Sequence, residues 1–202
     1  MSAGIIVDGQ AEPAAFRALF PKLVGLGARP KVLYAALQPM ASPGQIARKA
    51  ISRVRRLRDR KAHPVILLID RENRRDCPPA FAAEVQKALE RLGEAEVFVV
   101  VKNRALENWL IADPDGLARL RGRFRLTQAF HQRVSPNKAD TIRDAASFLG
   151  RVCLGMPYHK RRDPPRVLRA IDVAAAARNS RSLRRFLRLV GDTRYTAQSK
   201  KP

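Results

Sequence analysis

Several acidic residues of this chain lie where their side chains could share a divalent cation. Asp8 follows a short apolar run at residues 5–7. Asp70 follows a longer apolar run at 64–69, and Glu72 comes two residues later. In an extended segment the side chains of residues i and i+2 point the same way, so Asp70 and Glu72 are expected to share one face. Carboxylate oxygens of this kind suit Mg²⁺ or Mn²⁺.

Two such ions about 3.5–4 Å apart can activate water and stabilise the leaving oxygen of a phosphodiester. A simpler interpretation is that these acids cap helices or pair with neighbouring arginines on the surface. A single Asp-x-Glu is weak evidence for a metal site, but Glu107 also follows an apolar run, at 97–101. Acids at several run ends favour a shared site, because without a metal they would repel one another and one would take up a proton.

The elements that must position these acids are strands alternating with helices. Apolar runs at 5–7, 31–36, 64–69 and 97–101 predict four strands. Helical spacing predicts helices over 12–27, with a break at Pro21, from Ser42-Pro43 to about residue 58, around 81–92 and around 106–110. This alternation predicts an α/β fold with a mostly parallel sheet covered on both faces. Binding sites in such sheets form outside the carboxyl ends of the strands, where the acids are expected.

The last third of the chain has no strand pattern. Residues 140–149, 165–177 and 180–190 are predicted to be helical. The expected organisation is an α/β core at 1–115, a helical extension packed on it at 116–192, and a frayed polar tail at 193–202. The single tryptophan, Trp109, has helical spacing with apolar neighbours and is expected to anchor the core rather than stack on a base.

The charge of the chain predicts an anionic partner. Its 202 residues include 40 Lys and Arg against 18 Asp and Glu, a formal net charge of +22. Such a surplus repels itself, and polyphosphate backbones supply the anion that offsets it. Nucleic acid, DNA or RNA, is the expected partner, although an arginine-rich composition also accompanies high-GC genomes. The basic face of the helix after residue 43 and the loop after Asp70 supply candidate phosphate contacts: Arg48, Arg53, Arg55, Arg56 and Arg74.

Other classes of protein are disfavoured. Cys77 and Cys153 are far apart and form no Cys/His cluster, which argues against a zinc site or a disulfide framework. The first residues lack the pattern of a signal peptide, and no apolar run is long enough to span a membrane. The expected location is therefore cytoplasmic.

A second basic cluster lies at 160–169 and includes Lys160 and Arg161. These two residues are further candidate phosphate contacts. At least one of the two basic clusters is expected to be ordinary solvated surface.

Three segments resemble one known family. The sequences at 5–12, 67–72 and 105–114 resemble the TOPRIM-like family called domain of unknown function 4276, and the likeness extends to segments around 136–138, 158–160 and 180–187. The stretch from Glu107 to Asp113, Glu-Asn-Trp-Leu-Ile-Ala-Asp, is its most specific part. TOPRIM domains use such acids to hold Mg²⁺ for phosphodiester chemistry. The resemblance therefore implies a TOPRIM-like core and a nuclease activity.

The resemblance also implies roles for particular residues. Asp8 would be a metal ligand or general acid–base, and Asp70 with Glu72 would be the metal-binding pair. Further carboxylates of the family would be Glu12 and Glu107, and Lys138 and Lys160 would contact phosphate. Asp8 stands where the family usually has Glu, and Glu72 where it has Asp. The first change shortens the side chain by one methylene and the second lengthens it by one. The two changes either compensate within one site or mark an inactive member of the family.

Two hypotheses follow. The first is a Mg²⁺-dependent (or Mn²⁺-dependent) TOPRIM-like nuclease or phosphodiesterase in which Asp8, Asp70 and Glu72 are catalytic. The second is a non-catalytic nucleic-acid-binding or regulatory protein that has kept the fold. The family resemblance suggests an ATPase partner in a bacterial defence or genome-maintenance system in either case.

Overall fold

A single parallel sheet organises the molecule. The computed structural model describes residues 2–197. The sheet has the strand order β2-β1-β3-β4, and every neighbouring pair is parallel. Its strands are β1 (Ser2–Val7), β2 (Lys31–Tyr34), β3 (Ala62–Asp70) and β4 (Val97–Lys102). The predicted α/β fold with a parallel sheet of four strands and flanking helices is confirmed.

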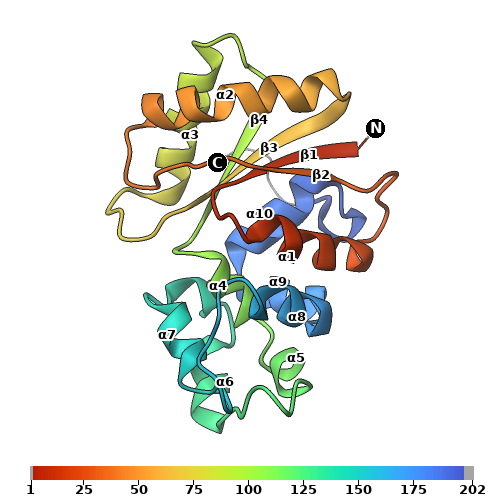
Figure 1. The fold of residues 1–202 in the computed structure, drawn as a ribbon, viewed down its shortest axis with the longest axis vertical. Helices are drawn as coiled ribbons and strands as arrows, with labels where there is room; N and C mark the ends of the chain where they lie inside the picture. Colours follow the sequence, from red (N-terminus) through yellow and green to blue (C-terminus); the bar gives the residue numbers. More distant parts are fainter. Residues whose placement is uncertain (1, 198–202) are drawn as a thin grey trace.

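Helices cover both faces of this sheet, as Figure 1 shows. On one face lie α2 (Pro43–Asp59) and α3 (Pro78–Glu90), packed on Ile6, Leu67 and Val99. On the other lie α1 (Glu12–Leu19) and α10 (Arg181–Val190), packed on Ile5, Ile66 and Val100. Successive side chains of a strand point to opposite faces of the sheet. Because both faces are covered here, the strands are apolar at consecutive positions rather than at alternate ones.

Local signals explain where the helices around the sheet begin and end. α2 starts at Pro43 after a capping box, in which Ser42 and Gln45 each accept a hydrogen bond from the other's backbone N–H. The predicted helix over 12–27 is too long. α1 ends at Leu19 and passes into a 3₁₀ turn, η1 (Phe20–Lys22), because Pro21 has no N–H to continue the helical ladder.

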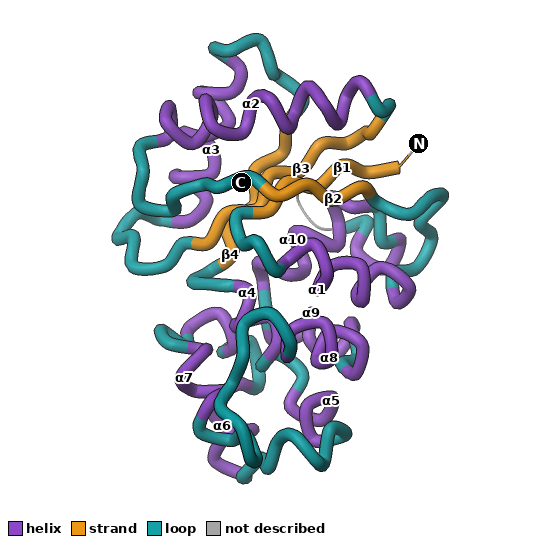
Figure 2. The backbone as a smooth tube through the Cα atoms, viewed as in Figure 1, coloured by secondary structure: helices purple, strands orange, loops and turns teal. Residues whose placement is uncertain are grey.

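Short helices make up the part of the chain between β4 and α10, which lies beneath the sheet (Figure 2). They are α4 (Leu106–Leu110), α5 (Pro114–Ala118), α6 (Gln128–Val134), η2 (Ala139–Thr141), α7 (Ala145–Gly150), α8 (Asp163–Ala170) and α9 (Val173–Asn179). The predicted helix over 165–177 is two helices, because Asp172 caps α9 by accepting a hydrogen bond from Ala175 N–H. The predicted helix over 140–149 begins only at Ala145.

Trp109 connects the helices to the sheet. Its side chain is fully buried, and its ring lies against Phe16 of α1 and Phe186 of α10. Its indole Nε1–H donates a 2.8 Å hydrogen bond to Ser182 Oγ, which also bonds to the buried Asp140 carboxylate. The prediction that this tryptophan is a core anchor is confirmed. One apolar cluster runs from the sheet into the helical part, and the division near residue 115 stays a prediction.

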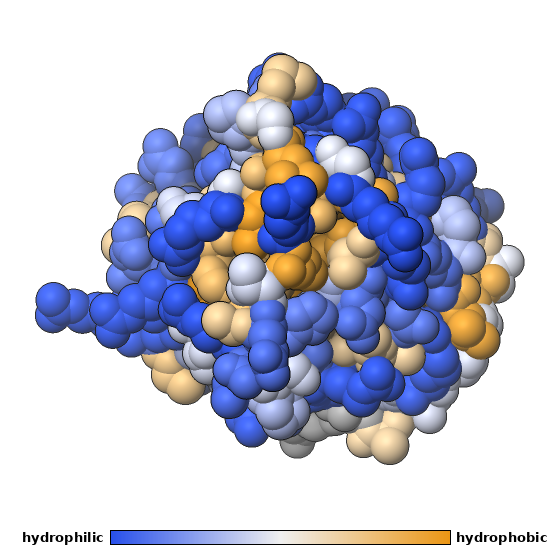
Figure 3. Space-filling view, turned by 90° about the horizontal axis from the view of Figure 1, so that it is seen from below, coloured by the Kyte–Doolittle hydropathy of each residue, from blue (hydrophilic) through white to orange (hydrophobic). Residues whose placement is uncertain are grey.

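The segment after α10 is only partly the polar tail that was expected. Thr193–Tyr195 forms a 3₁₀ turn, η3, and Thr193 N–H donates to Val24 O, while residues 198–202 lie outside the described residues. Hydrophilic side chains dominate the lower end of the molecule and surround one apolar area (Figure 3). Among residues 2–197, no helix is both long and apolar enough to cross a membrane.

We expect the start of α5 to tolerate no side chain at Gly116. A Cβ there would lie 2.3 Å from Asp113 Oδ2 and 2.6 Å from Ile171 Cα. Asp113 is buried and accepts a 2.6 Å hydrogen bond from Asp172 N–H, so it cannot move away without losing a partner. Gly116→Ala should therefore lower the free energy of unfolding by about 1–3 kcal/mol in urea denaturation. Gly122→Ala is the matched control, because nothing lies within 4 Å of its Cβ position; equal losses in both would contradict this assignment.

Candidate functional site at the carboxyl edge of the sheet

The predicted acids lie at the point where the sheet changes direction. The chain places β2 on one side of β1 and then crosses to the other side for β3 and β4. In open parallel sheets, ligands bind in the crevice beyond the carboxyl ends of the strands at such a reversal. Asp8 directly follows β1, and Asp70 ends β3 beside it. Asp70 N–H donates a 2.7 Å hydrogen bond to Asp8 Oδ2, which fixes one acid against the other.

Three carboxylates meet there around a lysine. Oxygens of Asp8, Glu12 and Asp70 all lie within 4.8 Å of one another. The Nζ of Lys102 lies 3.0 Å from Asp8 Oδ1 and 2.9 Å from Asp70 Oδ1, and it also donates to Glu12 Oε1. The Lys102 side chain is fully buried. We call these four residues the acid cluster.

Sequence reasoning missed Lys102, although a signal was present. It ends an otherwise apolar strand, β4, and it is the register partner of Asp70. A lysine at the end of a strand that is buried on both faces has no water nearby, and buried lysines are rare unless they are paired. That position pointed to an anionic partner at the same edge of the sheet.

Gly9 allows Glu12 to reach the cluster. Glu12 is the first residue of α1, and its N–H donates to Gly9 O in the turn that follows β1. A Cβ on Gly9 would lie 2.8 Å from Glu12 Cγ, closer than side-chain carbons approach. Glycine is therefore the residue that lets the Glu12 side chain fold back over the turn towards Asp8.

Burial and charge make the cluster electrostatically unusual. Burial raises the pKa of Glu12 to about 7; Lys102 opposes this rise and Asp8 adds to it. Burial likewise raises the pKa of Asp70 well above its ordinary value. For Lys102, burial disfavours the charge, but the Asp70, Asp8 and Glu12 carboxylates outweigh it and raise its pKa. With every group ionised, three carboxylates and one ammonium leave a net charge of −2.

The cluster fits a divalent cation in donor type and in charge. Its oxygens are the hard ligands that Mg²⁺ and Mn²⁺ prefer, and one such ion would offset the net charge of −2. Asp70 Oδ1 is buried and, apart from its ion pair with Lys102, has no hydrogen-bond partner in residues 2–197. Asp8, Glu12 and Asp70 would be the ligands, and Lys102 already provides one positive charge in the same cradle.

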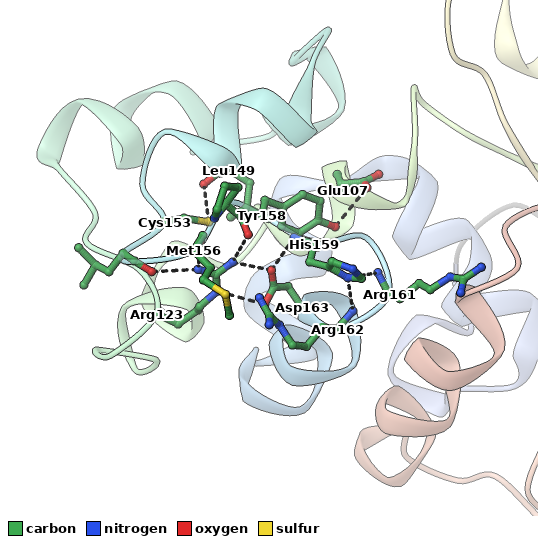
Figure 4. Close-up of polar contacts among 12 residues, drawn as sticks. Glu107, Arg123, Leu149, Cys153, Met156, Tyr158, His159, Arg161, Arg162 and Asp163 are labelled. Carbon is green, nitrogen blue, oxygen red and sulfur yellow. Dashed lines mark hydrogen bonds and ion pairs between the residues drawn. The ribbon is translucent and has the colours of Figure 1, made fainter.

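Two of the five predicted carboxylates lie outside this cluster. The expectation that Asp70 and Glu72 share a face is wrong, because β3 ends at Asp70 and Glu72 has a left-handed backbone with φ of 49°. Its side chain is exposed. Glu107 is buried in α4 and accepts a 3.1 Å hydrogen bond from the Tyr158 hydroxyl, as Figure 4 shows.

The loop at 151–162 brings two of the predicted cations to this region. Arg123 holds the loop by donating to Leu154 O, Met156 O and Pro157 O and by pairing with the buried Asp163 carboxylate (Figure 4). Arg161, in the turn that ends this loop, donates a 2.7 Å hydrogen bond to Gln10, two residues after Asp8. Lys160 is exposed beside it. The loop therefore connects the helical part to the turn that carries the acid cluster.

The other predicted phosphate contacts have different surroundings. Arg48, Arg53, Arg55 and Arg56 are exposed on α2, which runs from the carboxyl edge of the sheet to the opposite edge. Arg55 pairs with Glu94, and Arg53 donates to Tyr34 O. Arg74 is committed to the fold, because it pairs with Asp76, donates to Pro39 O and Ala41 O and lies over the Phe81 ring. Lys138 is exposed at η2.

The raised pKa of Glu12 predicts a pH dependence of stability. Between its ordinary value of 4.5 and about 7, the folded state keeps a proton that the unfolded state has released. The contribution of Glu12 to stability therefore falls as pH rises through this window. In urea unfolding measured in EDTA across this pH window, the free energy of unfolding of Glu12→Gln should decline less with rising pH than that of the wild type. The decline should not disappear, because the raised pKa of Asp70 acts in the same direction. The exposed Glu84→Gln should leave it unchanged, and an unchanged decline in Glu12→Gln would contradict the assignment.

Lys102 is expected to hold the carboxylates in place. Lys102→Met keeps the length of the side chain but leaves buried carboxylates without a counter-charge, which should cost about 3–5 kcal/mol of unfolding free energy in EDTA. The exposed Lys87→Met on α3 is the control and should change stability by less than about 0.5 kcal/mol. Equal stability of the two variants would mean that the ion pairs around Lys102 do not support the fold.

Comparison with known proteins identifies a family for the chain. No curated protein and no solved structure matches it. A family model described as "Domain of unknown function (DUF4276)" matches residues 7–190. The match includes every member of the acid cluster, the Trp109 anchor and all of α10. The chain therefore belongs to the DUF4276 family.

Proposed function

We propose that the chain is a Mg²⁺- or Mn²⁺-dependent, TOPRIM-like phosphodiesterase that cleaves nucleic acid. The observation that carries the proposal is the meeting of Asp8, Glu12 and Asp70 at the reversal point of a parallel sheet. A net charge of +22 on the same chain supports a polyanionic substrate. The TOPRIM-like relationship itself is part of the proposal.

The residues of the cluster have separate parts in this proposal. Asp8, Glu12 and Asp70 hold the cation, and the 2.7 Å hydrogen bond from Asp70 N–H to Asp8 Oδ2 fixes the Asp8 carboxylate. Without a cation, burial raises the pKa of Glu12 to about 7, so binding of the ion would release a proton from this carboxyl group near neutral pH. A bound divalent cation would supply an activated water and charge stabilisation at the phosphate.

Lys102 is a positioning residue in this proposal. Its ammonium group is fully buried and contacts all three carboxylates, so they keep their places in the absence of a metal. A preorganised set of ligands loses less entropy on binding than one that must be assembled. Glu72, which is exposed and outside the cluster, is not proposed as a ligand.

A second candidate is a non-catalytic nucleic-acid-binding or regulatory protein. Lys102 favours it, because a buried ammonium among three carboxylates already forms an ion cluster without a metal. Binding of nucleic acid would then rest on the basic surface alone. An ATPase partner stays a prediction under both candidates.

Cleavage assays separate these candidates. The purified chain should cut a plasmid or a long RNA when Mg²⁺ or Mn²⁺ is added and should stop in EDTA. Asp8→Asn and Asp70→Asn should each lower the rate by about a hundredfold or more, because each removes one charged group from the site. Glu72→Gln should keep the rate within about twofold of the wild type, because that side chain lies outside the cluster.

Other outcomes would contradict the proposal. Equal cleavage by the wild type and Asp70→Asn would identify a contaminating nuclease. Absence of cleavage, with nucleic-acid binding that is salt-sensitive and unchanged in Asp8→Asn, would favour the non-catalytic candidate. Calorimetry with Mn²⁺ alone provides an independent check, because Asp70→Asn should weaken the binding of the ion whether or not any substrate is cut.

A further inference from the structure

The turns that follow β3 and β4 are joined by two residues with left-handed backbones. Glu72 has φ of 49° and Arg104 has φ of 96°. Glu72 N–H donates a 2.8 Å hydrogen bond to Arg104 O, and Arg104 Nη1 donates a 2.9 Å bond back to Glu72 O. Such conformations are strained in residues other than glycine and persist only where the surroundings fix them. The pair holds the Arg104 side chain in one place, two residues after Lys102.

Arg71 is fixed in the same region. Its N–H donates a 3.0 Å hydrogen bond to Lys102 O, which extends the β3–β4 pairing past Asp70. Its guanidinium Nη1 donates to Asn103 Oδ1 at 3.0 Å. The Nε of this guanidinium is buried and has no hydrogen-bond partner in the described part of the chain. A buried N–H without a partner is costly, so a ligand that accepts from it would be stabilised.

A third guanidinium comes from the helical part. Asn108 connects the turn of Arg104 to the segment of Arg143, because its Oδ1 accepts from Ala105 N–H and its Nδ2 donates to Ile142 O. Burial lowers the pKa of Arg104, and the charges of Arg71 and Arg143 lower it further. Within residues 2–197, none of the three takes part in an ion pair with a carboxylate, although eleven ion pairs are formed elsewhere. Like charges held together without a counter-charge favour an anionic ligand.

A cavity continues this positive region into the helical part. Its volume is about 540 Å³, and Arg143 forms part of its wall. Three more cations line it, against a single acid, Asp144, which is engaged as the N-cap of α7. The additional cations are Arg133, Lys138 and Arg151. This size and charge suit phosphate groups rather than an apolar ligand.

We propose that Arg71, Arg104 and Arg143 form a phosphate-binding site beside the acid cluster, and that the cavity at Arg143 extends it along the bound chain. The site rests on the proposed function: it would hold a phosphate of the nucleic acid next to the one that is cut. Arg71 and Arg104 lie in the turns that follow Asp70 and Lys102, so the phosphate site would be at the same edge of the sheet as the carboxylates. Arginine suits this role because its planar fork donates two parallel hydrogen bonds to phosphate oxygens.

The test measures binding without cleavage. Affinity for a single-stranded oligonucleotide is measured in EDTA over a series of salt concentrations, for the wild type, Arg143→Gln and Arg104→Gln. Each lost phosphate contact should lower the slope of log K against log salt by about 0.7 and should weaken binding by about tenfold at low salt. Arg143 is exposed and outside the β3–β4 turns, so Arg143→Gln keeps the test valid if Arg104→Gln fails to fold.

Arg91→Gln is the matched control. Arg91 is exposed just after α3, at the edge of the sheet opposite the acid cluster, and its loss removes the same charge from the chain. It should leave the salt slope unchanged. An equal fall in Arg91→Gln and Arg143→Gln would show diffuse attraction to the whole basic surface and would overturn the proposal.

Calorimetry with inorganic pyrophosphate separates this proposal from the proposed function. Weaker pyrophosphate binding by Arg143→Gln than by Arg91→Gln supports the phosphate site. If no oligonucleotide is bound at the same time, the site serves a small phosphate compound and the nuclease proposal fails. Unchanged pyrophosphate affinity and unchanged salt slope in Arg143→Gln overturn the site. If Asp70→Asn nevertheless loses cleavage, the proposed function is supported and only the phosphate site is rejected.

Discussion

The carboxyl edge of this protein depends on one buried ammonium group. Lys102 brings together carboxylates that belong to the ends of two strands and the start of a helix. Without it, Asp8, Glu12 and Asp70 would repel one another in a medium that screens charge poorly. The lysine can reach them because β4 pairs in register with β3, which puts Lys102 beside Asp70. Sheet pairing, rather than any contact between loops, therefore sets the geometry of the candidate site.

Carboxylates and guanidinium groups occupy separate positions at that edge. The acids are gathered inward around Lys102, whereas the guanidinium groups of Arg71 and Arg104 extend from the turns just beyond the strands. The two sets come from neighbouring positions in the chain, yet Asp70 and Arg71 do not pair with each other in the structure. In the proposed function, this separation would place a cation-binding side and an anion-binding side next to each other at the phosphate.

The sequence was sufficient for the sheet and for part of the site. Runs such as 65–69 predict a buried strand because no polar residue interrupts them, and an acid directly after such a run must lie at the carboxyl edge. Asp8 and Asp70 were located in this way. Glu72 was misplaced because the rule for i and i+2 holds only while a strand continues, and nothing in the composition of the segment marked the left-handed turn. Lys102 was missed because a search for acids ignores the cation that they surround.

The helical part was predicted less well for a related reason. Its helices are short, and their ends are set by side-chain caps such as Asp172 and by long-range bonds such as that from Trp109 to Ser182, which leave little periodic pattern. The last of them, α10, has a further consequence because it covers the sheet face next to α1. During synthesis, α1 is available early for the part of this face near β2, whereas the part at β3 and β4 stays uncovered until residue 190 has left the ribosome. That part of the sheet is therefore the last to be buried, and its apolar side chains stay exposed on the nascent chain until then.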